Sequence, residues 1–209
     1  MHSGSAPEGN ESPTAAQGDA VTAELQRWAA GEPNAGDLVF PLVYRELRTI
    51  AHRQRRRWPG QHSLETTDLV NEAYLRLAGA HGLVIRDRAH FFALVSRTIR
   101  QVISNYARRA HAAKRGAGDV PVSLDEAHVA PHDGDDTLVA RVLVVEDALA
   151  ALARIHPRPC QVVECRIFGG LTVPETAEAL GLSEATVKRD WVTAQAWLHR
   201  ALAHPESRA

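Results

Sequence analysis

The segment from Gly169 to His199 constrains the fold more than any other part of this chain, because its residue types indicate two capped helices with a tight turn between them. Thr172 followed three residues later by Glu175 is a capping-box pattern, which predicts that a helix begins just after Thr172. Gly181 suits the left-handed backbone that ends a helix, and Ser183 is placed to cap the next one. Together these signals predict a helix-turn-helix.

The second helix of this pair has one apolar face and one polar face. Its apolar residues recur at steps of three and four, at Val187, Trp191, Ala194 and Leu198. The opposite face carries Thr186, Lys188 and Arg189 near its beginning, the end that a recognition helix inserts into the major groove of DNA. A plainer alternative is an ordinary helical domain in which these polar side chains are merely solvated.

The charged residues are strongly segregated along the chain, although the formal net charge of the 209 residues is only −1. Residues 1–40 carry a net charge of −5, and residues 41–118 carry +10 from fifteen basic and five acidic side chains. Residues 119–147 reverse the sign to −7. A cationic block of this size attracts phosphate through counterion release, so the low net charge does not exclude a nucleic-acid partner.

Composition argues against several other classes of protein. The longest apolar runs are short, whereas a membrane-spanning helix needs about 20 apolar residues. The first twenty residues have no basic start followed by an apolar stretch, so they do not predict a secretory signal. Cys160 and Cys165 are the only cysteines, and with His156 they make an incomplete metal set, since neither a CxxC pair nor a fourth ligand is evident. We therefore expect a reduced cytoplasmic protein with no metal and no cofactor.

Residues 116–137 divide the chain into two parts. This segment is rich in Gly, Pro, Asp and His and has neither a helical nor a strand period, which is typical of a linker. The start of the chain has the composition of a disordered tail. The expected organisation is a disordered tail at 1–20, a basic helical domain at 21–115, a flexible acidic linker at 116–137, a helix-turn-helix domain at 138–203 and a short tail at 204–209.

Apolar periodicity predicts three helices in the basic domain, and no segment alternates as a strand does. The expected helices run from Leu38 to Trp58, from Leu64 to Ala78 and from about Ala89 to His111. The first and the third end in clusters of arginine. Phe91 and Phe92 suit either base stacking or core packing, and their spacing favours the core.

Three segments, in this order, resemble the extracytoplasmic-function sigma factors of bacterial RNA polymerase. The family's polymerase-binding helix is matched by ETTDLVNEAYLRLA, its promoter-melting helix by AHFFALVSRTIRQVISNYARRAHAAKRG, and its C-terminal domain by PCQVVECRIFGGLTVPETAEALGLSEATVKRDWVTAQAWL. The resemblance covers about residues 21–203. It implies an all-α fold of two small helical bundles, one like sigma region 2 and one like sigma region 4. It also implies a chain without catalysis of its own that directs core RNA polymerase to promoters.

The resemblance implies two contact surfaces on the first bundle. The side chains that would contact core RNA polymerase are Glu65, Asp68, Asn71 and Glu72. Between this helix and the next, relatives hold a flipped base of the minus-10 element, and an unstacked base requires a pocket with a cationic lining. The arginines placed to serve the minus-10 element are Arg86, Arg88, Arg97, Arg100, Arg108 and Arg109. The alternative for Asp68 and Glu72 is a solvated acidic pair on an amphipathic helix.

On the second bundle, the resemblance implies recognition of the minus-35 element by the helix-turn-helix. Ser183 and Thr186 suit contacts with phosphate, whereas Lys188 and Arg189 suit contacts with base edges. The expected partners are core RNA polymerase and promoter DNA, with an anti-sigma factor or a Ser/Thr kinase as candidate regulators. We expect neither a membrane nor a small-molecule substrate, and a cytoplasmic location that becomes nucleoid-associated on binding to polymerase.

One departure from the family concerns the start of the polymerase-binding helix. Many relatives have an acidic Asp-Ala-Glu-Asp stretch before Leu-Val, where this chain has Glu65, Thr66, Thr67 and Asp68. We hypothesise that polymerase binds weakly until Thr67, or as a second choice Thr66, is phosphorylated, because a phosphate adds a charge of about −1.5 to −2. The alternative is that Thr67 simply caps the helix.

Two other functions compete with the sigma factor. A helix-turn-helix transcriptional regulator that acts without docking on polymerase would need a ligand-binding or receiver domain, which the basic domain does not resemble. A nucleic-acid hydrolase would need metal-ligand spacing or paired carboxylates, and the eleven histidines are scattered without either. The segregated charges also suggest that the two bundles close on each other and mask the DNA surface when polymerase is absent.

Overall fold

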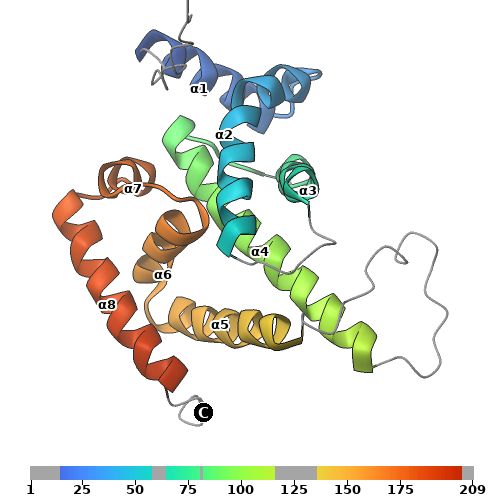
Figure 1. Ribbon diagram of the computed structural model, residues 1–209. Coiled ribbons are helices and arrows are strands. Elements are labelled where there is room, and N and C mark those ends of the chain that lie inside the picture. Colours follow the sequence, from blue (N-terminus) through green and yellow to red (C-terminus); the bar gives the residue numbers. More distant parts are fainter. Residues whose placement is uncertain (1–14, 58–64, 81, 116–135, 204–209) are drawn as a thin grey trace, which may run out of the picture.

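The computed structural model describes residues 15–57, 65–80, 82–115 and 136–203, and most of these residues are helical. The helices, in chain order, are α1 (Ala15–Ala29), α2 (Ala35–Arg57), α3 (Thr66–Ala78), α4 (Arg88–Arg115), α5 (Asp136–Ile155), α6 (Pro157–Val163), the π-helix η1 (Glu164–Phe168), α7 (Val173–Leu180) and α8 (Glu184–Ala203). The prediction of an all-α fold is therefore confirmed for the described part of the chain. Figure 1 shows the long helix α4 running between the N-terminal and the C-terminal helices.

The observed bounds differ from the expected ones at two of the domain borders. Helix α1 begins at Ala15, inside the segment expected to be a disordered tail, so the tail prediction is wrong for residues 15–20. Helix α5 begins at Asp136, at the end of the expected linker. The rest of the linker prediction, at residues 116–135, lies outside the described residues, as do residues 1–14 and 204–209.

Helices α1 to α4 form one bundle around an apolar core. The buried side chains include Leu25, Val39, Val43, Leu69, Val70, Val95 and Ile99. Phe91 and Phe92 are buried as well, so the expectation that they pack in the core is confirmed. Leu38 and Leu42 belong to the apolar pattern of α2 but are 52% and 47% exposed, which leaves an apolar strip on the outside of this bundle.

A cluster of aromatic rings joins the four helices of the N-terminal bundle. Trp28 of α1 stacks on Tyr74 of α3, with ring centroids 5.3 Å apart, and meets the edge of Phe91 of α4 at 6.3 Å. Phe40 of α2 lies 4.5 Å from the Tyr74 ring, and the Tyr74 hydroxyl donates to the carbonyl of Gly36 at 2.9 Å. These contacts fix the rotation of α3 and thereby determine which of its faces points outward.

Helices α5 to α8 form the C-terminal bundle. Helix α5 packs against α6 and α8, and α7 packs against α8. A small apolar cluster of Val162, Ala177 and Val187 lies at the centre of α6, α7 and α8. Within the described ranges, no helix is both long and apolar enough to cross a membrane.

The two bundles lie directly against each other. Helix α4 contacts α5, η1 and α7, and Figure 1 shows α5 and α7 on the same side of it. One continuous core contains buried residues of both bundles, such as Val95 and Ile99 from α4 with Leu149 and Phe168 from the C-terminal side. The expectation of two small helical bundles thus holds for the helices, but the bundles share a core instead of standing apart.

Candidate nucleic-acid and protein interfaces

The helix-turn-helix is formed by the local signals that the sequence contains. The Thr172 hydroxyl accepts a hydrogen bond from the Glu175 N–H at 3.4 Å, and the Glu175 carboxylate accepts one from the Thr172 N–H at 2.7 Å, which closes the capping box. Gly181 has the left-handed conformation, with φ of 65°. The next residue, Leu182, donates its N–H to the Ala177 carbonyl at 2.8 Å, which completes the end of α7.

The start of α8 presents polar and basic side chains. Ser183 caps this helix, because its hydroxyl accepts from the Thr186 N–H at 3.2 Å and lies 2.9 Å from the Thr186 hydroxyl. Lys188 and Arg189 are exposed, and the Lys188 ammonium lies 3.5 Å from the Glu184 carboxylate in an exposed pair that contributes little to stability. The structure therefore brings together, at one end of α8, the four residues expected to meet the minus-35 element.

An ion pair that the sequence analysis missed holds α8 in place. Asp190 is only 4% exposed and accepts from the Arg158 guanidinium of α6 through both carboxylate oxygens, at 2.5 and 3.1 Å. Hydrogen bonding to Asp190 raises the pKa of Arg158. Asp190 follows Arg189 directly, so this bidentate contact sets the rotation of the helix and the direction in which Lys188 and Arg189 point.

Helix α3 buries one face and exposes the polar face expected to contact polymerase. Its buried residues are Leu69, Val70, Ala73 and Leu77. Asp68 and Asn71 are exposed, and Glu72 is half-buried and paired with Arg76 at 2.7 Å. Leu75 is 63% exposed and lies about two helical turns from Asp68, on the same side of the helix. This leucine was not predicted from the sequence, and it gives the polar face an apolar patch.

The first turn of α3 settles the role of its two threonines in capping. Glu65 is the N-cap residue, and its N–H donates to the Asp68 carboxylate at 3.2 Å. Thr67 lies inside the helix and is exposed, whereas Thr66 is half-buried. The alternative that Thr67 caps the helix is therefore wrong, since Glu65 occupies that position.

Two of the arginines expected to serve the minus-10 element lie at the junction between the preceding segment and α4. Arg86 donates to the Ala179 carbonyl of α7 at 2.9 Å, so its guanidinium contacts the helix-turn-helix. Arg88 pairs with Glu46 of α2 at 2.9 Å, and its guanidinium carbon lies 4.9 Å from the centre of the Phe92 ring. Both side chains are already engaged by protein groups in this arrangement.

Helix α1 positions this segment, a role that the sequence analysis did not identify. Gln26 donates to the Arg86 carbonyl at 2.5 Å, and the Thr22 hydroxyl accepts from the Arg88 N–H at 3.1 Å. Asp87 begins α4 by accepting from the His90 N–H at 2.7 Å. These contacts fix the backbone on both sides of the arginines, and the only local signal for them was the aspartate before α4.

The remaining four arginines of α4 lie on two different faces. Arg97, Arg108 and Arg109 are exposed, as contact with phosphate requires. Arg100 is 8% exposed, so in this arrangement it does not reach phosphate as the sequence analysis expected. The reason is that its face of α4 is covered by α5 and η1, which carry two carboxylates at the right distance to receive it.

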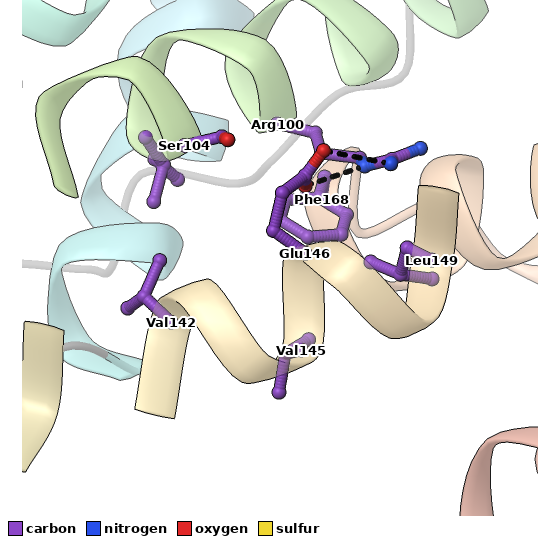
Figure 2. Close-up of a pocket in the computed structure, with 8 residues that line it drawn as sticks. Arg100, Ser104, Val142, Val145, Glu146, Leu149 and Phe168 are labelled. Atoms are coloured by element: carbon purple, nitrogen blue, oxygen red, sulfur yellow. Dashed lines mark hydrogen bonds and ion pairs between the residues drawn. The ribbon is translucent and has the colours of Figure 1, made fainter. Parts of the chain in front are cut away.

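Arg100 is the centre of a buried ion cluster. Its guanidinium donates to both oxygens of Glu146 at 2.9 Å and to Glu164 at 2.6 Å, and Figure 2 shows the paired contact with Glu146. Although burial opposes its charge, the hydrogen bonds and charge of these two carboxylates raise the pKa of Arg100 above its ordinary value. Burial raises the pKa of Glu164, with Arg100 acting in the opposite direction.

The alternative of a metal site receives no support from the geometry. Cys160 and Cys165 are buried, whereas His156 is exposed. In the ranges that the structure covers, no three His, Cys, Asp or Glu side chains come together in the way that metal ligands do.

Comparison with known proteins identifies the family. A family model described as ECF sigma factor matches residues 18–204, so this chain belongs to the ECF sigma factor family. Its members are non-enzymatic proteins that bind core RNA polymerase and promoter DNA and direct transcription initiation, and they act in the cytoplasm. Searches of curated proteins and of solved structures each gave no significant match.

Proposed function

We propose that the two bundles divide the work of a sigma factor between them. The N-terminal bundle binds core polymerase through Glu65, Asp68, Asn71 and Glu72 of the α3 face. It binds the minus-10 element through Arg86, Arg88, Arg97, Arg108 and Arg109, and Arg100 joins them once its two carboxylate partners move away. The C-terminal bundle binds the minus-35 element through Ser183, Thr186, Lys188 and Arg189. The observation that carries this proposal is the start of α8, where a capped helix end and two exposed cations follow a tight turn.

Run-off transcription with core polymerase tests this assignment, with template fragments selected from genomic DNA by binding to the holoenzyme. We expect Arg189→Ala to lower initiation about fivefold or more, because a bidentate contact with a base edge is worth about 1 to 3 kcal/mol. Arg200→Ala is the matched control, since Arg200 is exposed at the other end of the same helix. Equal losses of initiation for both variants contradict the proposal that the start of α8 contacts base edges.

We further propose that phosphorylation of Thr67 completes the polymerase-binding surface. The exposed hydroxyl lies in the first turn of α3, where a phosphate meets free backbone N–H groups and the positive end of the helix dipole. The added charge lies next to Asp68 and supplies a carboxylate-like charge that this chain lacks. Thr66 is the second choice, because its side chain is half-buried.

Binding of the purified chain to core polymerase tests the switch. We expect weak binding by the unmodified chain and by Thr67→Ala, and tighter binding after treatment with a Ser/Thr kinase or in Thr67→Asp. Thr66→Asp adds the same charge one residue away, so a comparison with Thr67→Asp decides between the two proposed sites. Equally tight binding by all forms rules out the switch and leaves the sigma factor itself intact.

We also propose an anti-sigma factor and a Ser/Thr kinase as regulatory partners. Association with the nucleoid follows when the chain is bound to polymerase. The competing function is a helix-turn-helix regulator that acts without polymerase. If the chain binds DNA but directs no initiation by core polymerase, either before or after kinase treatment, that function replaces ours.

A further inference from the structure

We propose that the contact between the two bundles is an autoinhibitory clamp, in which the C-terminal bundle covers the side of α4 that serves the minus-10 element until the two bundles separate. What the clamp inhibits rests on the function proposed above. The closed state itself rests on the contacts described next.

Side chains from α2 and from the segment just before α4 donate hydrogen bonds to backbone carbonyls of the C-terminal bundle. Gln54 is 1% exposed and donates to the carbonyls of Ile167 and Phe168, at 2.7 and 2.9 Å. Arg53 donates to Gly170 at 3.3 Å, and Arg86 donates to Ala179 at 2.9 Å. Carbonyls at the ends of helices lack partners within the helix, and here the other bundle supplies them.

The buried ion cluster also connects the two bundles. Glu146 belongs to α5 and Glu164 to η1, so both carboxylates that receive Arg100 come from the opposite bundle. A guanidinium held in this way is unavailable to DNA phosphate, and it becomes available only when the bundles part. Carboxylates and phosphate therefore compete for one arginine.

The surfaces of α4 and of the C-terminal bundle also approach each other very closely at one point. A Cβ atom at Gly169 would lie 2.0 Å from the Ser96 hydroxyl oxygen, so α4 approaches the end of η1 at a distance that only glycine allows. A small cavity remains along the same seam, between Ser104 of α4 and Val142, Val145 and Leu149 of α5 (Figure 2). The close approach at Gly169 indicates a specific contact between the bundles.

The closed arrangement is incompatible with simultaneous contact to both promoter elements. The minus-10 and minus-35 elements lie about 25 base pairs apart, which is roughly 85 Å at about 3.4 Å per base pair. In this structure α7 packs on α4, and a Cβ at Gly181 of the turn would lie only 3.4 Å from the Arg86 guanidinium. The twenty residues between α4 and α5 have a maximum reach of about 70 Å, so the bundles can part without unfolding.

A charge-reversal pair tests the clamp in the full-length chain. Glu146→Arg places a cation against Arg100, whereas Asp147→Arg makes the same change of charge at the next, exposed residue of α5. We expect Glu146→Arg to increase the radius of gyration in small-angle scattering and to bind DNA fragments at least tenfold more tightly than Asp147→Arg without polymerase. The matched net charge removes the general electrostatic contribution, and equal helix content by circular dichroism verifies that both variants fold.

The outcomes separate the clamp from the sigma factor function. Equal radii and equal DNA affinities for the two arginine variants overturn the clamp. If no form initiates transcription but Glu146→Arg still expands and binds DNA more tightly than Asp147→Arg, the closed state stands and the sigma factor function fails.

Discussion

At the scale of single residues, several groups with shifted pKa values lie near Arg100. One guanidinium faces two carboxylates, so the cluster carries one negative charge in excess. The Cys160 thiol lies 3.6 Å from the same guanidinium, yet burial and the nearby Glu164 raise the pKa of this thiol to about 11. Burial likewise raises the pKa of Cys165 to about 12. Both thiols are therefore neutral at physiological pH and resist oxidation.

These raised pKa values predict a loss of stability in alkali. Because each thiol holds its proton more tightly in the folded chain, its contribution is complete below the unfolded pKa of about 8.5 and is lost as the pH rises toward 11 or 12. We expect a loss of about 1 to 2 kcal/mol per thiol at pH 10, measured by urea denaturation at pH 8 and pH 10. Cys160→Ala/Cys165→Ala should be less stable at pH 8 but fall less steeply. Parallel losses in both proteins contradict this explanation.

At the scale of elements, two glycines in helical segments should respond to substitution in opposite directions. Gly18 lies inside α1 with open space around its Cβ position, so Gly18→Ala should raise the free energy of unfolding by about 0.5 to 1 kcal/mol. Gly181 ends α7 with a positive φ, so Gly181→Ala should lower it by about 1 to 2 kcal/mol. Chemical denaturation measures both changes. Equal effects of the two variants would show that backbone conformation is not the cause.

The elements that were predictable from the sequence are those whose partners lie nearby in the chain. The hydrogen bonds of Thr172, Gly181 and Ser183 span no more than five residues, so residue type and spacing were enough to predict them. Helix α1 was missed because its first residues resemble a polar tail, and the contacts of Trp28 with Tyr74 and Phe91 lie far away in the sequence.

The orientation of the arginines on α4 was beyond prediction for the same reason. Glu146 and Glu164 lie 46 and 64 residues beyond Arg100, so no local pattern distinguishes Arg100 from the exposed Arg97. The exposure of Leu38, Leu42 and Leu75 also depends on how neighbouring helices pack. Of the candidate surfaces, the composition of the α8 face was predictable, whereas the engagement of Arg86 and Arg100 by the opposite bundle was not.

At the scale of the whole molecule, a shared core couples the two bundles. Phe168 from the C-terminal side belongs to the same buried cluster as Ile99 of α4. Separation of the bundles exposes this apolar surface to water, and the buried ion cluster loses its partners at the same time. In the closed state the unfolding of one bundle therefore removes contacts that stabilise the other, which makes the described helices a single cooperative unit.

Calorimetry tests this cooperativity. We expect the wild-type chain to unfold in one transition whose calorimetric and van't Hoff enthalpies agree, because in the closed state each bundle is stabilised by its contacts with the other. Glu146→Arg should unfold in two transitions, since each small bundle then unfolds alone, and the less stable bundle should melt several degrees below the wild type. Asp147→Arg should keep the single transition, because Asp147 is exposed. Two transitions in the wild-type chain contradict the coupling, because bundles that stabilise each other through a shared core in the closed state unfold together.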